Sequence, residues 1–163
     1  SLAACKDFLC CREESGEAYD EDDLAGYWGD PRKCDTPLRT LEALYRHINR
    51  LHPDIDFIYW TGDLPAHDIW KQTKQSNADI VRVTAQQLKR HFPDTPVYPA
   101  LGNQESVPVD SFPPPTISME SVSMSWLHDV LVEEWNHWLG HSHSWSVKKG
   151  EAQVPKVKEA MKF

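Results

Sequence analysis

The sequence predicts an α/β fold, because stretches with helical periodicity alternate with short β-rich stretches from residue 38 onward. Two β-rich stretches are separated by one helical stretch, which is typical of parallel strands joined through a helix. The chain has 163 residues, 40% of them hydrophobic, which is enough for one domain with its own core. An irregular segment that holds all four cysteines precedes this part.

The first 36 residues lack a sustained hydrophobic period and contain Cys5, Cys10, Cys11 and Cys34. An even number of cysteines in a loop-like segment predicts two disulfides, for which three pairings are possible. Cys10 and Cys11 are not expected to pair with each other, because a bond between neighbouring cysteines is strained. A zinc site is the alternative, but no two cysteines are separated by two residues. Two disulfides would imply an oxidising compartment.

An acidic run at residues 20–23 suggests a calcium-binding loop. Such a loop needs an oxygen ligand at its fifth position and glycine at its sixth, where this chain has Leu24 and Ala25. The run is therefore interpreted as a solvated surface segment.

The first predicted helix begins after Thr36 and Pro37, which suit an N-cap and a first helical position. Pro53 follows its end. Its apolar residues at helical spacing are Leu38, Leu41, Leu44, Tyr45, Ile48 and Leu51. Residues 55–61 are rich in β-branched and aromatic side chains, and they are predicted to form a buried strand that stops at Gly62.

A second helix is predicted over residues 77–92. Its apolar face consists of Ile80, Val81, Thr84, Leu88 and Phe92. After a turn, residues 96–101 are predicted to form a second strand, which must be short because Pro96 and Pro99 lack an amide hydrogen. A third helix is predicted over residues 125–139, with Gly140 suited to its C-cap.

Charge and hydropathy argue against two classes of protein. The formal net charge is −8 and the isoelectric point is near 5.4, whereas a nucleic-acid-binding protein usually carries a basic surface. No apolar run reaches the ~20 residues that a membrane-spanning helix needs. The first residues show neither the basic nor the apolar segment of a signal peptide.

Both predicted strands end in a glycine followed by an oxygen-bearing side chain, Gly62-Asp63 and Gly102-Asn103. In α/β proteins, ligands gather outside the carboxyl ends of the strands. A carboxylate can bridge two metal ions and an amide oxygen can bind one, and a metal pair can clamp a phosphoryl group and activate water. His67, four residues after Asp63, could protonate a leaving alkoxide. A strand end followed by a surface histidine is the alternative that spacing alone leaves open.

Longer sequence motifs in the chain indicate a protein family more specifically than these single residues do. They are IYWTGDLPAHDIW at residues 58–70, PVYPALGNQES at 96–106, SFPPP at 111–115, CDTPLRTLEAL at 34–44, GYWG at 26–29 and the cysteine spacing at 5–11. Together they resemble the acid sphingomyelinase family, a branch of the calcineurin-like metallophosphoesterases. The matches follow the family's order from Cys5 to about Trp138 and so cover most of the chain.

The resemblance implies a four-layer α/β sandwich that carries two zinc ions (Zn²⁺). Asp63 corresponds to the carboxylate that bridges the two zincs, and Asn103 to the amide that binds one zinc and the phosphate. His67 corresponds to a histidine proposed as the acid toward the leaving ceramide oxygen. The implied reaction splits sphingomyelin into ceramide and phosphocholine in a secreted or lysosomal protein. The implied disulfides are Cys5–Cys10 and Cys11–Cys34.

Three departures from the family pattern bear on activity. Gln104 stands where the family has histidine, and its amide cannot serve as a general acid because it does not give up a proton. The loss of a general acid typically lowers the rate by ~10²–10⁴. The family's Asp-x-His metal pair, expected before Cys5, is missing. The family's later metal histidines are also missing. His141 and His143 look like the family's final Gly-His-x-His, but they follow a helix directly and are interpreted as a coincidence in a solvated tail.

Two recognisable ligands are fewer than the three protein ligands of a typical catalytic zinc, so the chain alone is predicted to be inactive. Residues 1–139 are expected to be part of a metallophosphoesterase catalytic domain, seen as an internal fragment, and residues 140–163 an unmatched Lys-rich tail. Contact with a membrane surface would need the family's saposin domain, which is not in this chain. The alternatives are a non-catalytic paralogue that binds lipid or a partner, which Gln104 favours, and a phosphodiesterase for other phosphodiesters.

Overall fold

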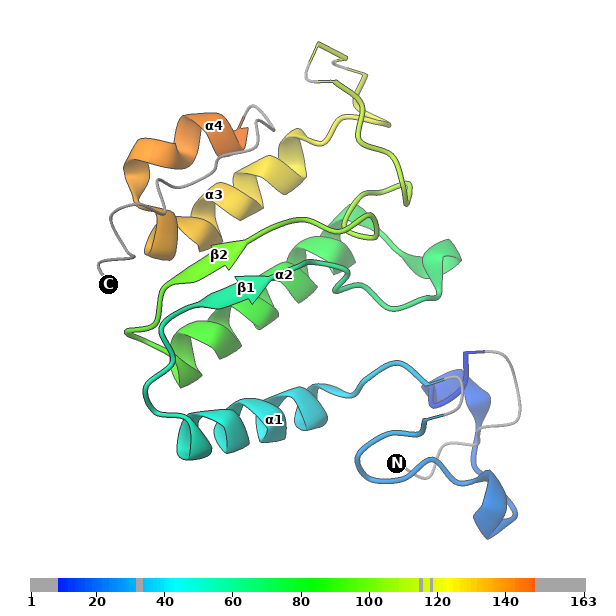
Figure 1. Ribbon diagram of the computed structural model, residues 1–163. Coiled ribbons are helices and arrows are strands. Elements are labelled where there is room, and N and C mark those ends of the chain that lie inside the picture. The colour runs from blue at the N-terminus through cyan, green and yellow to red at the C-terminus, as the bar shows by residue number, and fades with distance from the viewer. Residues whose placement is uncertain (1–8, 32–33, 115, 118, 149–163) are drawn as a thin grey trace. The chain divides into compact units, whose positions relative to one another are not determined.

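The structure is a computed structural model that describes residues 9–31, 34–114, 116–117 and 119–148 (Figure 1). The chain divides into two compact units. The first unit contains Ser1–Asp54 and Ala66–Trp70, and the second contains Ile55–Pro65 and Lys71–Phe163.

The first unit contains the helix α1 (Leu38–Leu51), which confirms the first predicted helix and its end. Pro37 rather than Thr36 is the N-cap, because its extended ψ of 145° places it outside the helix. The carbonyl of Pro37 accepts the first hydrogen bond of the helix, from the amide of Thr40 at 2.9 Å. The predicted cap was therefore wrong by one residue.

A disulfide joins Cys11 to Cys34, and this confirms one of the two pairings that the resemblance implies. Cys10 is also disulfide-bonded, whereas Cys5 lies outside the described residues. The acidic run forms the short helix η2 (Glu21–Asp23), which follows η1 (Glu13–Ser15). No group of three potential metal ligands occurs among the described residues, in the acidic run or elsewhere.

The second unit is built on two parallel strands, β1 (Ile58–Trp60) and β2 (Val97–Pro99), which pair Ile58 with Val97 and Trp60 with Pro99. The parallel arrangement is as predicted, although both strands are shorter than the predicted segments. Pro99 has no amide hydrogen, and the last hydrogen bond runs from the amide of Ala100 to the carbonyl of Trp60 at 2.7 Å. The four-layer sandwich stays a prediction, because the described residues form one two-stranded sheet.

Helix α2 (Lys74–His91) connects the two strands and begins three residues before the predicted start. A capping box explains this earlier start: the amide of Ser76 donates to Thr73 Oγ1 at 3.0 Å, and the amide of Thr73 donates to Ser76 Oγ at 2.9 Å. The box satisfies amides that the helix itself leaves unpaired.

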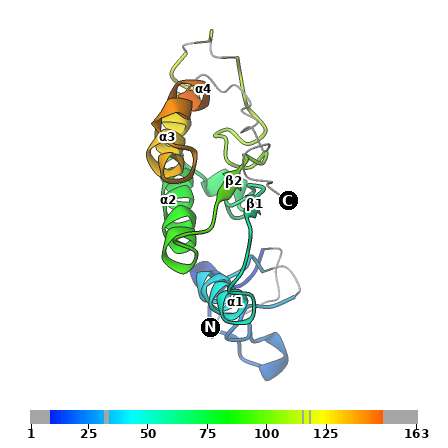
Figure 2. The ribbon, with the colours of Figure 1, turned by 60° about the vertical axis from the view of Figure 1, so that its left-hand side comes forward.

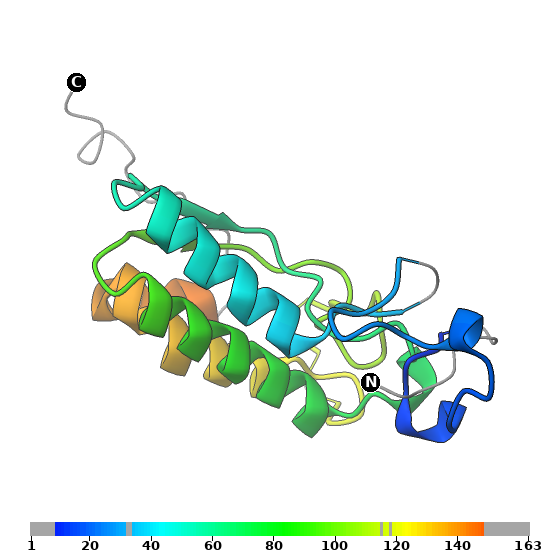
Figure 3. The same ribbon diagram turned by 90° about the horizontal axis from the view of Figure 1, so that it is seen from below.

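The core of the second unit lies between the strand pair and two helices, α2 and α3 (Ser125–Leu139), which confirms the third predicted helix. The two helices run side by side on one face of the strands (Figures 2 and 3). Their buried side chains include Val81, Ala85, Leu88, Leu127, Leu131 and Trp135. From the strands, Trp60 and Val97 are buried, and the Trp60 ring lies edge-on to Trp135 with 6.0 Å between centroids.

Residues 140–148 are not the solvated tail that the sequence suggested. Gly140, at a φ of +73°, leads into η4 (His141–His143) and α4 (Ser144–Lys148), and α4 packs against α3. Ser144 Oγ donates to Asn136 Oδ1 at 2.8 Å, and Lys148 Nζ lies 3.2 Å from Asp129 Oδ1. The periodicity missed this helix because five residues are too few to show a period. Within the described ranges, no helix is both long and apolar enough to cross a membrane.

Candidate functional site

The turns that follow β1 and β2 approach each other so closely that neither can carry an ordinary side chain at its glycine. A Cβ atom on Gly62 would lie 2.0 Å from the amide nitrogen of Gly102, and Gly62 has a φ of +78°. A Cβ atom on Gly102 would lie 2.1 Å from Asp63 Oδ1. The two glycines that the sequence singled out are therefore required by the contact between the turns.

This contact brings the predicted ligand Asp63 next to the turn that holds Asn103. The amide of Gln104 donates to Asp63 Oδ1 at 3.2 Å, and Asp63 has a φ of +58°. Both Asp63 and Asn103 are exposed at the carboxyl end of the strand pair. Asn103 Nδ2 donates to Asp110 Oδ1 at 2.7 Å, which leaves its amide oxygen as the atom available to a ligand. The predicted juxtaposition is observed, while the metal-binding roles stay predictions.

The side chain of Glu105 bridges the two turns through hydrogen bonds to one backbone amide in each. Its side chain is only 1% exposed, and its Oε1 accepts from the amide of Leu64 while its Oε2 accepts from the amide of Gly102, both at 2.7 Å. A buried carboxylate is stable only where donors satisfy it, and here two backbone amides do so. Glu105 was not predicted as a site residue, because a glutamate in a predicted loop carries no local sign of burial.

Asn77 supports the same turn from helix α2. Its side chain is 1% exposed, and Nδ2 lies 3.3 Å from the carbonyl of Gln104 and 3.2 Å from that of Glu105. From the sequence, Asn77 was predicted only as the start of a helix. An asparagine on the buried face of a predicted helix is the signal that could have identified it.

The other predicted site residues of this unit are less favourably placed. Gln104 is half-buried, and its buried Oε1 has no hydrogen-bond partner within the described part of the chain. His141 and His143 both lie in η4, and neither belongs to a group of three potential metal ligands within the described ranges.

The two predicted metal ligands are fewer than a catalytic zinc normally has. Asp63 and Asn103 offer one carboxylate and one amide oxygen. A catalytic zinc usually has three protein ligands and a water molecule. Among the described residues no group of three or more His, Cys, Asp or Glu side chains could hold a metal ion. The described part of the chain therefore does not make a complete zinc site.

The remaining candidate, His67, lies in the first unit, where it is held by Asp35. The ring Nδ1 lies 2.6 Å from Asp35 Oδ1, and the amide of His67 donates to Asp35 Oδ2 at 3.1 Å. The side chain of His67 is 64% exposed, so the pairing occupies one edge of the ring and leaves the other edge accessible.

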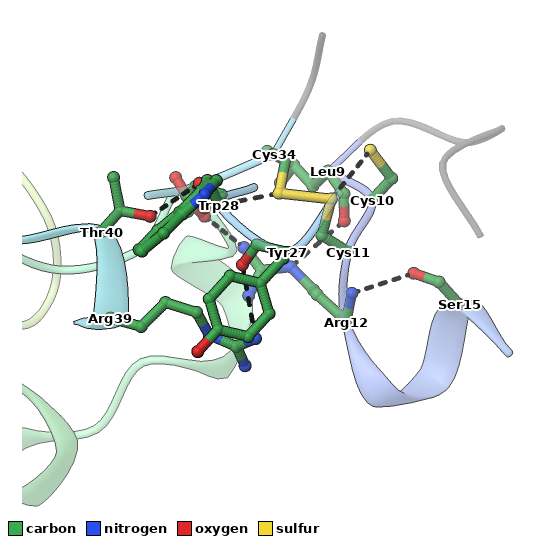
Figure 4. Close-up of a disulfide and its surroundings, with 11 residues drawn as sticks. Leu9, Cys10, Cys11, Arg12, Ser15, Tyr27, Trp28, Cys34, Arg39 and Thr40 are labelled. Atoms are coloured by element: carbon green, nitrogen blue, oxygen red, sulfur yellow. Dashed lines mark hydrogen bonds and ion pairs between the residues drawn. A yellow bond between two sulfur atoms is a disulfide. The ribbon is translucent and has the colours of Figure 1, made fainter. Parts of the chain in front are cut away.

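Arg12 holds Asp35 in turn. Its Nη2 lies 2.5 Å from Asp35 Oδ2, and its Nη1 lies 3.0 Å from the carboxylate of Asp68, the residue after His67. The Cys11–Cys34 disulfide joins the residues that directly precede Arg12 and Asp35, and Figure 4 shows Arg12 beside it. Arg12 and Asp35 were not predicted as site residues, because 23 positions separate them in the sequence.

The charge of Asp35 is stabilised by these neighbours. Burial raises the pKa of Asp35, but hydrogen bonds from the ring and amide of His67, with the positive charges of His67 and Arg12, outweigh burial. The net result is a pKa below the ordinary value of 3.8. Asp35 is therefore an ionised acceptor at any physiological pH.

Comparison with known proteins identifies the class to which these features belong. No protein-family model matches the chain. Individual relatives do match, and they are phosphodiesterases. Human sphingomyelin phosphodiesterase is 45% identical over 135 residues, which is 83% of this chain and 21% of that protein. Sphingomyelin phosphodiesterase 1 of Caenorhabditis elegans is 35% identical over 163 residues, which is 100% of this chain and 28% of that protein.

A more distant relative is named for another substrate: the bovine cyclic GMP-AMP phosphodiesterase SMPDL3A is 29% identical over 152 residues, 91% of this chain and 30% of that protein. The chain is similar to sphingomyelin phosphodiesterases, at 35–45% identity over most of its own length. It spans between 21% and 28% of the length of these two relatives named for sphingomyelin.

Proposed function

We propose that this chain supplies part of the active site of a phosphodiesterase that hydrolyses sphingomyelin to ceramide and phosphocholine. The observation that carries the proposal is the pair of exposed oxygen donors, Asp63 and Asn103, at adjacent turns after two parallel strands. The similarity to sphingomyelin phosphodiesterases supports the substrate. The four-layer sandwich of the family would be the setting of this pair.

In this proposal Asp63 and Asn103 would be two ligands of a two-zinc site, and the zinc ions would supply the activation of water and of the phosphoryl group. The chain alone would then lack activity, because two ligands are fewer than the three protein ligands of a typical catalytic zinc. Glu105 and Asn77 position the two ligand-bearing turns. His67 transfers its Nε2 proton to the leaving oxygen as water replaces that oxygen on phosphorus, so that the alkoxide leaves as an alcohol. A secreted or lysosomal location is consistent with the disulfide.

Two measurements test the proposal. The first is the zinc content of the oxidised, dialysed 163-residue chain, which we expect to be near zero. A value near two would show that the site is completed within the chain and would make His141 and His143 ligand candidates. The second is sphingomyelin hydrolysis by a chimera in which the matched 135 residues of the human relative are replaced by those of this chain. We expect the chimera to be active and Asp63→Asn to abolish that activity.

Gln104 favours a second candidate, a non-catalytic paralogue that binds lipid or a partner. If Gln104 merely removes one acid, the chimera should be slower than the human protein by ~10²–10⁴, and Gln104→His should restore most of the rate. If the chain comes from a non-catalytic paralogue, the chimera should stay inactive with either residue. Hydrolysis of cyclic GMP-AMP but not of sphingomyelin would instead support a phosphodiesterase for other phosphodiesters.

A further inference from the structure

The first unit contains a charged cluster that fixes one edge of the His67 ring. Asp35 Oδ1 lies 2.6 Å from Nδ1 of the His67 ring, and Asp35 Oδ2 accepts from the backbone amide of His67 at 3.1 Å. Both contacts come from a single residue and reach different oxygens of one carboxylate. The position of the ring and the position of its backbone are therefore set by the same group.

The carboxylate is itself restrained on its far side. Arg12 contacts Asp35 Oδ2 through Nη2 and Asp68 Oδ2 through Nη1, and its Nε donates to the carbonyl of Leu9 at 3.2 Å. The guanidinium is thus engaged in three directions, which its planar fork of five N–H donors allows in one fixed geometry. The side chains of Arg12 and Asp68 are 19% and 14% exposed, so these contacts are largely shielded from water.

Free neutral histidine carries its proton mainly on Nε2, and a carboxylate that accepts from Nδ1 reverses this preference. We propose that Asp35 is the positioning residue of His67: it holds the ring with its proton on Nδ1, so that Nε2 faces outward as the atom that takes up and delivers a proton. The high exposure of the ring fits this arrangement, because Nε2 has no hydrogen-bond partner among the described residues. Arg12 and the Cys11–Cys34 disulfide keep Asp35 in place.

The inference rests on the proposed function only for the use of the Nε2 proton, and its test does not require activity. The test is long-range proton–nitrogen NMR of the 163-residue chain with isotope-labelled histidines, which reports which nitrogen of the neutral His67 ring carries the proton. The variant His67→Gln would assign the signals of this ring. We expect the proton on Nδ1. A proton mainly on Nε2, or rapid exchange between both nitrogens as in free histidine, would overturn the proposal in the unmodified chain.

Two matched variants separate a specific contact from a general effect of charge. Asp35→Asn should move the ring proton to Nε2, because the amide offers Nδ1 a donor. Asp68→Asn removes the same charge from a residue that contacts Arg12 and not His67, and it should leave the proton on Nδ1. Equal effects of the two variants would contradict a positioning role for Asp35.

The chimera connects the tautomer to the reaction. There Asp35→Asn should lower kcat far more than it changes KM, because a wrong tautomer of a catalytic histidine costs up to ~10⁴ in kcat. If the proton lies on Nδ1 but the chimera hydrolyses nothing, the proposed function fails and the positioning role stands. If the chimera is active while the proton lies on Nε2, the positioning role fails and the proposed function stands.

Discussion

The backbone of Gly62 approaches that of Gly102 so closely that a Cβ atom on Gly62 would lie 2.0 Å from the Gly102 amide nitrogen. The contact joins the turns after two parallel strands, and each turn carries one proposed metal ligand. Any change that separates the turns should therefore act on stability and on the site together.

Gly62→Ala should destabilise the second unit strongly. Its φ of +78° costs an alanine about 1–2 kcal/mol, and the contact with Gly102 adds an overpacking term of about 1–3 kcal/mol. Urea unfolding followed by tryptophan fluorescence measures the sum. Gly140→Ala is the matched control, since Gly140 has a φ of +73° but no atom within 4 Å of the added Cβ. Equal losses in the two variants would mean that the turns separate at no cost.

Glu105→Gln should destabilise the same unit by about 1–3 kcal/mol, because one of the two backbone amides would then face an amide group instead of an acceptor. Thermal and urea unfolding test this. Glu133→Gln is the control, because Glu133 is exposed and contacts Arg82 at 3.3 Å on the surface; its effect should stay within about 0.5 kcal/mol. A Glu105 variant as stable as this control would exclude a bridging role.

The helices and the parallel strands were predictable because their signals are local. Helical spacing identified the helices at residues 38–51 and 125–139, apart from the cap of the first, and the β-rich runs identified both strands. The ends of the elements were less predictable, since they depend on single contacts. The Thr73–Ser76 capping box moved the start of α2, and the prolines shortened β2.

The candidate site was predictable only in part. Gly-Asp and Gly-Asn after successive strands predicted that Asp63 would lie near the Asn103 turn, and the structure shows this contact. The residues that hold the site were not predictable, because their partners are distant in sequence. Glu105 reaches Leu64 across 41 positions, and Asp35 reaches His67 across 32. Burial, which is nearly complete for Glu105 and partial for Asp35, is a property of the folded chain.

The second unit should lose stability in mild acid because of His128. Burial lowers the pKa of His128 below 6.5, although a backbone hydrogen bond with Lys148 and the charge of Asp129 act in the opposite direction. The unfolded chain therefore binds this proton more readily. The stabilisation is complete above pH 6.5 and is lost as the pH falls from 6.5 through the lower folded value.

Urea unfolding at a series of pH values measures this effect. The parent chain should lose stability over that window, and His128→Gln should show a smaller slope because it has no proton to bind. His137→Gln is the control on the same helix, since His137 is exposed. An identical slope in the parent and the His128 variant would assign the acid sensitivity to other groups.

Removing the Cys11–Cys34 disulfide should loosen the first unit. The bond closes a loop between residues separated by 23 positions, and its loss should cost about 3 kcal/mol through the greater freedom of the unfolded chain. The bond also lies next to Arg12 and Asp35, so its loss should free the contact between Asp35 and the amide of His67. The double variant Cys11→Ser/Cys34→Ser tests both consequences.

Hydrogen exchange of the backbone amides is the measurement. The amides of α1 and of His67 should exchange faster in the double variant by up to about two orders of magnitude. A loss of about 3 kcal/mol in unfolding free energy has this effect on amides that exchange only when the whole unit unfolds. The parent chain reduced with a thiol reagent should exchange at least as fast, because it loses the same bond. If the His67 amide kept its protection in the variant while α1 lost it, Arg12 alone would be enough to hold Asp35, and the disulfide would stabilise the unit without positioning His67.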